Sequence, residues 1–498
     1  MANMVWPDNV QRRLQKAPQD TWKNKELEAI VDASEILSAA QFQEIIARMQ
    51  AEGAFAIRLE HKELPQLNTI ITFSRAADTR AWPMGTNVWI RDLTLMAERL
   101  VTSASLPVFA ENKEIGKQMI LSALSLMSTP SQLNRFRAII SGRTDVTRAS
   151  NWPHIFLDSR DNLSGERMEG WSHKQEAWQM TAVVTLQMLQ SGILTASDLL
   201  PSHKEFLHMC APFLAAVKYW QNPSSGSWEE IEAVRSSVLA WDIVLLEELK
   251  AATLYSGLDI DELLEKGKEV LRRQWPNDAF GDSKDDPRHR EADAALMYLL
   301  QLHIAEKIFA PGEQAEREQQ ILDQIAELED VVTGGIRRYR GDSYQRVDFF
   351  RPDVAQKLQE YYGSTSGEAS TLDNFVARED IVPKGREAAW VHPVWQLAAW
   401  FGRRYLQSGD NVYKQKQHQY FIQGLSLVTG QGAVTVEPDE TGEIQLKEIL
   451  PWRIPECYIT VNIEGKDIIV PSPHTPLNWT IAEAIDAFVV MEQTLKQG

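Results

Sequence analysis

The sequence predicts an all-α protein in which an inner ring of helices is enclosed by an outer ring. Residues 177–189 and 238–246 are apolar on nearly every side, which indicates helices that are buried all round. Residues 261–273 and 313–331 mix Leu, Ile and Val with Glu, Lys and Arg, which indicates helices with one buried face. Because both kinds of helix alternate along the chain, we expect two concentric rings.

The two ends of the chain complete this outline. Phe42, Ile45, Ile46 and Met49 recur at helical spacing and predict a first helix, preceded by a polar segment that wraps the surface. Alternating polarity at 432–436 and 457–463 predicts a small β ribbon within 433–470, followed by a last helix at 480–495. We expect residues 1–50 to form the wrapping segment and first helix, and 51–498 to form one large domain.

Composition restricts the class of ligand. The chain has 498 residues, a net charge of -18 and a pI near 5.1, which argues against binding to nucleic acid or anionic membrane. It shows no signal segment and no apolar stretch that could cross a bilayer, so we expect a cytoplasmic protein with a neutral ligand. Cys210 and Cys457 are expected to be reduced or simply packed. No Cys/His spacing suits zinc, and we expect neither metal nor cofactor.

Two separate acidic segments carry the functional hypothesis. Residues 227–230 read Ser-Trp-Glu-Glu, and residues 453–456 read Arg-Ile-Pro-Glu, each in an aromatic-rich loop near a helix start. Cleavage of a glycosidic bond needs one carboxyl that stays protonated, which an apolar wall favours, and one that stays ionised to activate water. Taken alone, Glu229 and Glu230 are better explained as a solvated pair at a helix start, and Glu456 as an ordinary loop acid.

Four further segments offer polar and aromatic groups of the kind that bind sugars, although each is also compatible with a plain structural role. A helix-start acid with a surface arginine would explain the first, loop hydrogen bonds the second, and a solvated basic turn the third. The candidate residues are Trp89, Arg91 and Asp92 in 88–93, Trp171 and Gln175 in 169–175, Arg338, Asp342 and Tyr344 in 334–344, and Trp479 in 475–479.

In this order the segments resemble motifs of glycoside hydrolase family 15, the glucoamylases, and of the glycosidase-like domain of phosphorylase kinase α and β subunits. Residues 88–93 resemble Trp-x-Arg-Asp, 170–175 resemble Trp-Gly-x-x-Gln, and 228–230 resemble Leu-Trp-Glu-Glu. Residues 338–344 resemble Arg-Tyr-x-x-Asp-x-Tyr, and 455–456 with 475–479 resemble the closing segment. The resemblance covers about residues 80–495 and implies an (α/α)6 barrel.

The resemblance also implies roles for individual residues. Glu229 would be the general acid and Glu456 the general base of an inverting reaction, with the carboxyl groups about 6.5–9.5 Å apart to admit a water molecule. Residues that would bind the sugar are Trp89, Arg91, Asp92, Trp171, Gln175, Trp228, Glu230, Arg338, Asp342, Tyr344 and Trp479.

Three departures from the family pattern matter. Glu176-Ala177 stands where relatives have a polar residue and Asp, so one acid is expected to be missing from the floor of the sugar site. Residues 346–386 look like an insertion, and the chain has no room for the N-terminal β-sandwich of bacterial glucoamylases.

Three hypotheses follow. The first is an exo-acting α-glucoside hydrolase that acts on α-glucan ends or small α-glucosides. The second is a non-catalytic or regulatory carbohydrate-binding module, for which a protein partner is possible, and the third is a helical scaffold. Neither nucleic acid nor membrane is expected as a partner under any of them.

Overall fold

The computed structural model describes residues 22–31, 36–75, 77, 87–158, 163, 176–255, 257–344, 357, 360, 372–382, 386–438, 444–463 and 466–497. The expected surface-wrapping segment lies outside the described residues as far as residue 21, as does most of the expected insertion. The division of the chain at residue 50 stays a prediction.

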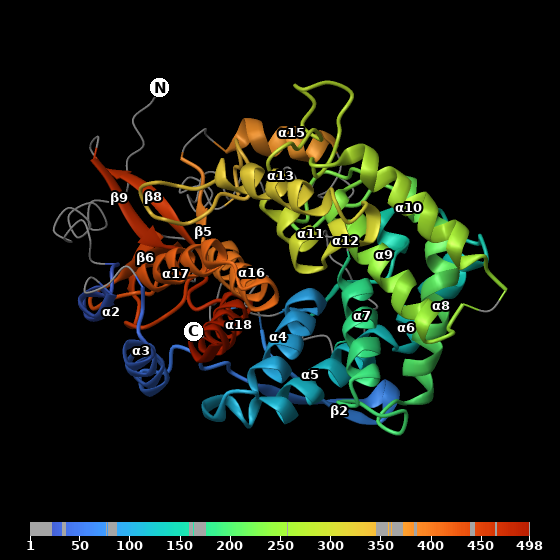
Figure 1. Cartoon of the computed structure of the whole chain (residues 1–498). Coiled ribbons are helices and arrows are strands. Elements are labelled where there is room, and N and C mark those ends of the chain that lie inside the picture. Colours follow the sequence, from blue (N-terminus) through green and yellow to red (C-terminus); the bar gives the residue numbers. More distant parts are fainter. Residues whose placement is uncertain are drawn as a thin grey trace.

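Six of the described helices form a closed inner ring (Figure 1). Each contacts the next in the order α4, α7, α9, α11, α16 and α18, and α18 returns to α4. Their bounds are Ile90–Ser103 (α4), Ala177–Gln190 (α7), Ser236–Ala251 (α9), Met297–Gln301 (α11), His392–Ser408 (α16) and Asn478–Gln497 (α18).

A second set of helices packs outside this ring, one against each inner helix. In the order of the inner ring they are α5 (Asn112–Met127), α8 (Pro201–Val217), α10 (Ile260–Gln274), α13 (Gln314–Ala326), α17 (Asn411–Ser426) and α3 (Ala39–Ala51). The expected double ring of helices is thereby confirmed. Shorter or peripheral helices are α2 (Lys25–Val31), α6 (Pro130–Ile140), α12 (Ile304–Ile308) and α15 (Leu372–Ile381).

Burial follows the pattern that the sequence indicated. Nearly every residue of α7 and α9 is buried, whereas α10 buries mainly the stripe that includes Leu263, Leu264 and Leu271. In α3 the four apolar residues of the predicted stripe are its buried ones, and Ser38 and Gln41 close its start as a reciprocal capping box. Helix α13 ends at Ala326, five residues before the expected end, because residues 329 and 336 pair as a β-bridge.

The expected C-terminal ribbon is present, but it is more than one hairpin. Strands β5 (Ala389–Trp390), β8 (Cys457–Ile463) and β9 (Lys466–Pro471) form one antiparallel sheet, and β6 (Val434–Pro438) pairs with β7 (Ile444–Glu448). Two small pairs were not expected: β1 (Glu60–Leu64) with β2 (Thr69–Phe73), and β3 (Asn87–Trp89) with β4 (Phe156–Asp158). They are short, and short strands carry too few residues for a clear period-2 signal.

Two further expectations concern the cysteines and the membrane. Cys210 and Cys457 are both buried and unbridged, in line with the packing role expected of them. Within the described residues, no helix combines the length and the apolar character that crossing a bilayer would take.

Candidate active site

All six inner helices begin at one end of the ring, and side chains at these starts contact one another. The guanidinium of Arg91, the second residue of α4, donates to the carbonyl of Ser227 in the loop before α9 (2.5 Å). The Ser227 hydroxyl donates to Glu176 at the N-cap of α7 (2.8 Å). His392, which opens α16, stacks on Trp479 at the start of α18 (ring centroids 4.1 Å apart).

The remaining start belongs to α11, which follows the short 3-10 helix η5 (Ala294–Leu296). The N-cap of η5 is Asp293, and its carboxylate accepts a hydrogen bond from the indole of Trp228 (2.7 Å). Helix N-termini carry partial positive charge and unpaired N–H groups. Their convergence therefore favours a site that collects carboxylates, as this one does.

Glu229 lies in a tight turn at this end of the ring. The turn is closed by two backbone bonds, from the Glu229 N–H to Gly226 O and from the Glu230 N–H to Ser225 O, each 3.1 Å long. Glu229 itself has a left-handed backbone (φ 57°), a conformation unusual for a residue other than glycine. Its carboxylate lies 3.3 Å from the Arg91 guanidinium and its side chain is 9% exposed.

Glu456 reaches the same place from the C-terminal sheet. It immediately precedes β8, and its carboxylate lies 2.8 Å from Nδ1 of His474. Its side chain is 4% exposed. Burial raises the pKa of Asp92, Arg91 opposes that rise, and the negative charge of Glu456 adds to it. Glu229 thus lies beside Arg91, Glu456 is close enough to the adjacent Asp92 to act on it electrostatically, and both side chains are largely buried.

Arg91 and Asp92 themselves retain hydrogen-bonding capacity. Arg91 Nε and Asp92 Oδ2 are 3.5 Å apart, and neither atom has a closer polar partner among the described residues. Both side chains are almost fully buried. Buried polar atoms usually have partners, so a pair held in this way can exchange its long contact for the hydroxyl groups of a ligand.

Arg338 organises the opposite side of the site. It forms a two-bond pair with Asp342 (2.6 and 2.7 Å) and a third bond to Glu230 (2.8 Å). Glu230 also accepts from Arg378 of α15 (2.8 Å) and from the hydroxyl of Tyr339. Although burial acts in the opposite sense, these arginines hold the pKa of Glu230 well below its ordinary value. Glu230 is therefore an ionised centre that fixes several cations.

Aromatic rings pack against both arginines of the site. The Arg338 guanidinium lies 5.2 Å from the ring centre of Trp228 and 4.7 Å from that of Tyr344, while Arg91 lies 5.0 Å from that of Trp479. Trp228 in turn contacts His392 (6.0 Å between ring centres). Burial, together with the positive charges of Arg91 and Arg338, lowers the pKa of His392 far below its usual value, so this imidazole is neutral.

The structure brings together most of the residues that the sequence analysis singled out. Trp89 belongs to β3 just before Arg91, and its ring packs on Phe156 (4.8 Å). Trp171 and Gln175 lie outside the described residues, so their placement stays a prediction. The site roles of all these residues stay predictions as well, since geometry alone assigns no chemistry.

Several residues of the site were missed by the sequence analysis. Tyr339 lies inside the 338–344 motif but was not singled out there, and the others stand outside the recognised motifs with no periodic signal of their own. The missed residues are Glu176, Arg290, Asp293, Tyr339, Arg378, Trp390, His392 and His474. The Glu176 carboxylate lies beside Ser227, while the acid expected to be missing from the floor of the sugar site stays a prediction.

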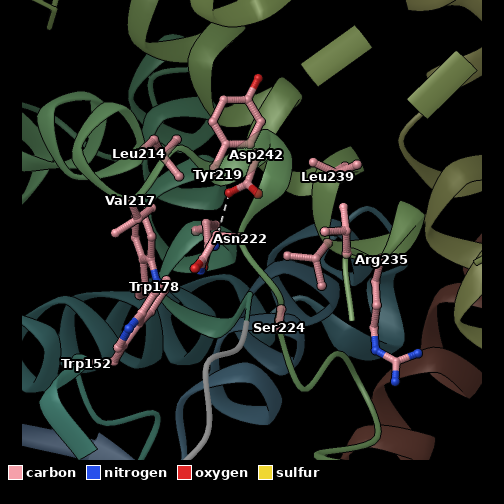
Figure 2. A pocket seen from close by; sticks show the side chains of 13 residues that line it. Trp152, Trp178, Leu214, Val217, Tyr219, Asn222, Ser224, Arg235, Leu239 and Asp242 are labelled. Carbon is pink, nitrogen blue, oxygen red and sulfur yellow. Dashed lines mark hydrogen bonds between the residues drawn. The ribbon is translucent and has the colours of Figure 1, made fainter. Parts of the chain in front are cut away.

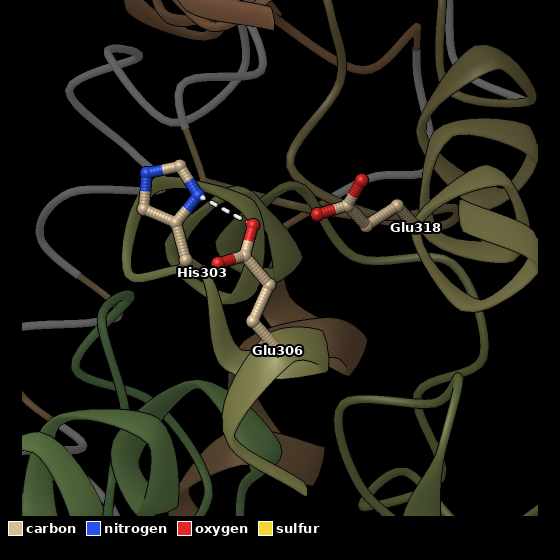
Figure 3. A group of neighbouring side chains, drawn as sticks. All are labelled: His303, Glu306 and Glu318. Carbon is tan, nitrogen blue, oxygen red and sulfur yellow. Dashed lines mark ion pairs between the residues drawn. The ribbon is translucent and has the colours of Figure 1, made fainter. Parts of the chain in front are cut away.

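One group elsewhere has the composition of a metal site. His303, Glu306 and Glu318 bring three potential ligand atoms within 4.8 Å of one another near α12 and α13 (Figure 3). Arg404 of α16 pairs with both carboxylates. A guanidinium already in that position neutralises the two acids and repels a cation, so this group is an ion-pair cluster.

Comparisons with known proteins support the fold. No protein-family model and no curated protein sequence matches this chain. Among solved structures, a glycosidase variant in complex with glucose is similar over 92% of this chain and 99% of its own (TM-score 0.54, 12% identity). The glucoamylase of Saccharomycopsis fibuligera is similar over 95% and 98% (TM-score 0.52, 10% identity), and that of Hormoconis resinae over 91% and 73% (TM-score 0.50, 12% identity). The expected glucoamylase-like (α/α)6 barrel is thereby confirmed.

Proposed function

We propose that this protein is an inverting, exo-acting α-glucoside hydrolase. The observation that carries the proposal is that Glu229 and Glu456, far apart in sequence, are both buried beside Arg91 and Asp92 in a site lined by aromatic rings. Two carboxyl groups, hydrogen-bonding cations and flat apolar surfaces are the parts that hydrolysis of a glycoside requires. The fold shared with glycosidases and glucoamylases supports a function of this kind.

In this proposal the terminal sugar is bound from two sides. Arg91 and Asp92 donate to and accept from its hydroxyl groups on one side, and the pair of Arg338 and Asp342 does so on the other. The indoles of Trp228 and Trp479 face the apolar surfaces of the sugar ring. Buried polar side chains of neighbouring inner helices bond to one another, Thr94 with Thr181 (2.8 Å) and Gln396 with Glu483 (3.1 Å), and in this proposal they form the floor of the site. A site with such a floor admits the end of a glucan chain rather than its middle.

The reaction is a single displacement at the anomeric carbon. Glu229 gives its proton to the glycosidic oxygen as the bond from that oxygen to the anomeric carbon breaks. Glu456 takes a proton from a water molecule as the water oxygen bonds to the same carbon from the opposite face. The products are a β-configured sugar and the shortened chain, and the two carboxyl groups end with exchanged protonation states.

Activity and stereochemistry test this proposal together. The protein is incubated with maltose, longer maltooligosaccharides, isomaltose and trehalose, and proton NMR follows the first sugar released. We expect hydrolysis of at least one of these substrates with β-glucose as the initial product. Release of α-glucose would reject inversion, and no turnover of any substrate would reject the hydrolase.

Substitution of each carboxyl group tests the residue assignment. We expect Glu229→Gln and Glu456→Gln each to lose turnover while keeping the fold. Glu269→Gln, on the outer helix α10, is the matched control and should retain full activity. Calorimetry with maltooligosaccharides runs in parallel, because saturable binding without turnover by the unmodified protein is the result that a non-catalytic carbohydrate-binding module predicts.

A further inference from the structure

Another buried carboxylate, that of Glu176, contacts the turn that carries Glu229. Glu176 is fully buried at the N-cap of α7, where its Oε1 accepts the hydroxyl hydrogen of Ser227 (2.8 Å). The carbonyl oxygen of the same serine accepts from Arg91 of α4 (2.5 Å). Ser227 is therefore held by two inner helices at a point two residues before Glu229.

The turn needs such support because its backbone is not in a relaxed state. The left-handed backbone of Glu229 (φ 57°) costs a residue with a Cβ about 1 kcal/mol, and only surrounding contacts can maintain it. The turn contributes two backbone bonds of its own, at Gly226 and Ser225. Contacts from outside the turn to its side chains include those of Ser227 with Glu176 and of Trp228 with Asp293.

We propose that Glu176 is a positioning residue for the reaction, which fixes the Glu229 carboxyl by holding Ser227 against the start of α7. This inference rests on the proposed function, in which Glu229 is the general acid. Glu176 touches neither reacting carboxyl through any contact found among the described residues; it acts through Ser227.

The surroundings of Glu176 suit this role. Burial raises its pKa, while the positive charge of Arg91 and the Ser227 hydroxyl oppose the rise, and Asp278 adds to it. On the side of α9, Gln179 of α7 donates to Asp242 (3.0 Å), and burial raises the pKa of Asp242 to about 7. Asp242 is thus largely protonated below neutral pH, so it adds little negative charge beside Glu176.

A small cavity lies next to Gln179 and Asp242, and Figure 2 shows it from close by. Its volume is about 20 Å³, which is room for one water molecule. Trp178, Gln179 and Asp242 line it, and the turn segment contributes Ser224 and Arg235. Trp178 and Gln179 lie two and three residues after Glu176, so this cavity adjoins the first turn of α7. The Ser227 contact ties the catalytic turn to the same part of the helix.

The test is a double-mutant cycle on Glu176 and Ser227. We expect Glu176→Ala and Ser227→Ala each to lower kcat roughly tenfold with KM within about twofold, because misplacing a catalytic group slows the chemical step more than it weakens binding. The double variant should fall by the same roughly tenfold factor and not by about a hundredfold, since both changes remove one interaction. Glu176→Gln retains an acceptor for the serine hydroxyl and should restore most of the activity.

Stability is followed alongside, to separate positioning from folding. Ser125→Ala is the matched control, because it removes a buried contact of similar length, 3.0 Å to His203, between the outer helices α5 and α8. It should lower the melting temperature about as much as Ser227→Ala while leaving kcat unchanged. Independent effects that multiply in the double variant, or unchanged kcat in Glu176→Ala, would overturn the proposal.

Failure of the proposed function gives a different pattern. If the unmodified protein hydrolyses no α-glucoside, the cycle is repeated on calorimetric affinity for the glucose-shaped imino sugar deoxynojirimycin, whose ammonium pairs with site carboxylates. The same non-additive loss would support the positioning of Glu229 without hydrolysis. Equal affinity in all variants, or no binding by the unmodified protein, would reject it.

Discussion

Glu229 and Glu230 are neighbours in one turn, yet they meet opposite surroundings. Glu230 accepts bonds from Arg338, Arg378 and Tyr339 and is held ionised by them. Glu229 has a left-handed backbone, and its carboxylate lies 3.3 Å from Arg91 of α4. The comparison teaches that two adjacent carboxylates of one turn can have different partners. Glu230 anchors several arginines, whereas Glu229 is the carboxyl group that we propose for catalysis.

The largest expected effect is on catalysis at Glu229. Glu229→Gln removes the transferable proton and should lower kcat by about 10²–10⁴-fold, the usual contribution of a general acid. Steady-state kinetics on the best substrate measure this. If the variant keeps full activity, Glu229 is not the acid, and the contrast between the two glutamates has no catalytic meaning.

Loss of the charge on Glu230 should instead damage the fold. Glu230→Gln leaves buried arginines without their counter-charge, and we expect a loss of about 3–5 kcal/mol in the free energy of unfolding. Denaturant unfolding measures it. Glu327→Gln is the control, because its pair with Arg340 is exposed and should be worth less than about 1 kcal/mol. Equal effects in the two variants would contradict the anchoring role of Glu230.

The buried carboxyl group of Asp242 should make the stability of the fold depend on pH. The pKa of Asp242 is about 7 in the folded protein and about 3.9 in an unfolded chain, so the folded state binds more protons between these values. The stabilising contribution of this proton is complete below pH 4 and is lost as the pH rises through 7, a change of up to about 4 kcal/mol.

Asp242→Asn isolates that dependence. The difference in unfolding free energy between the unmodified protein and this variant should shift steadily in favour of the variant from pH 4 to pH 7. Chemical unfolding at several pH values measures the difference. A difference that stays constant across this range would show that Asp242 titrates normally in the folded state.

The smallest expected effect concerns the indole of Trp228, the residue directly before Glu229. Trp228→Phe keeps an aromatic surface but loses the hydrogen bond to Asp293 (2.7 Å). This loss should lower the free energy of unfolding by about 1 kcal/mol. We expect KM to rise severalfold, with Trp220→Phe on the outer surface as the control. An unchanged KM would place Trp228 outside the sugar-binding surface.

The sequence predicted regular elements well wherever burial repeats along the chain. The stripe of α3 and the all-round burial of α7 and α9 were found from periodicity, because helical geometry alone decides which residues share a face. The motif acids were found from composition and order. Strands β1 to β4 were missed, because such short pairs are stabilised by their neighbours rather than by local preference.

Only part of the site could be predicted from the sequence. Arg91, Asp92, Glu229 and Glu456 carry motif signals, whereas Glu176, His392 and Asp293 are single residues at helix starts with no local pattern. The departure at Glu176 was interpreted as a missing acid. In the structure the Glu176 carboxylate accepts a hydrogen bond from Ser227, which lies 51 residues further along the chain, so no local pattern could reveal this contact.

By itself the sequence determined the helical class, the double layer and the carboxylates available, since these depend on periodicity and residue type. Only the tertiary structure decided that six helices start at one end, and hence that Glu229 comes to lie beside Arg91 and Glu456 close to Asp92. Closure of the ring depends on long-range contacts, because α18 at the end of the chain packs on α4 near its beginning. No local sequence pattern determines which helix starts will lie side by side.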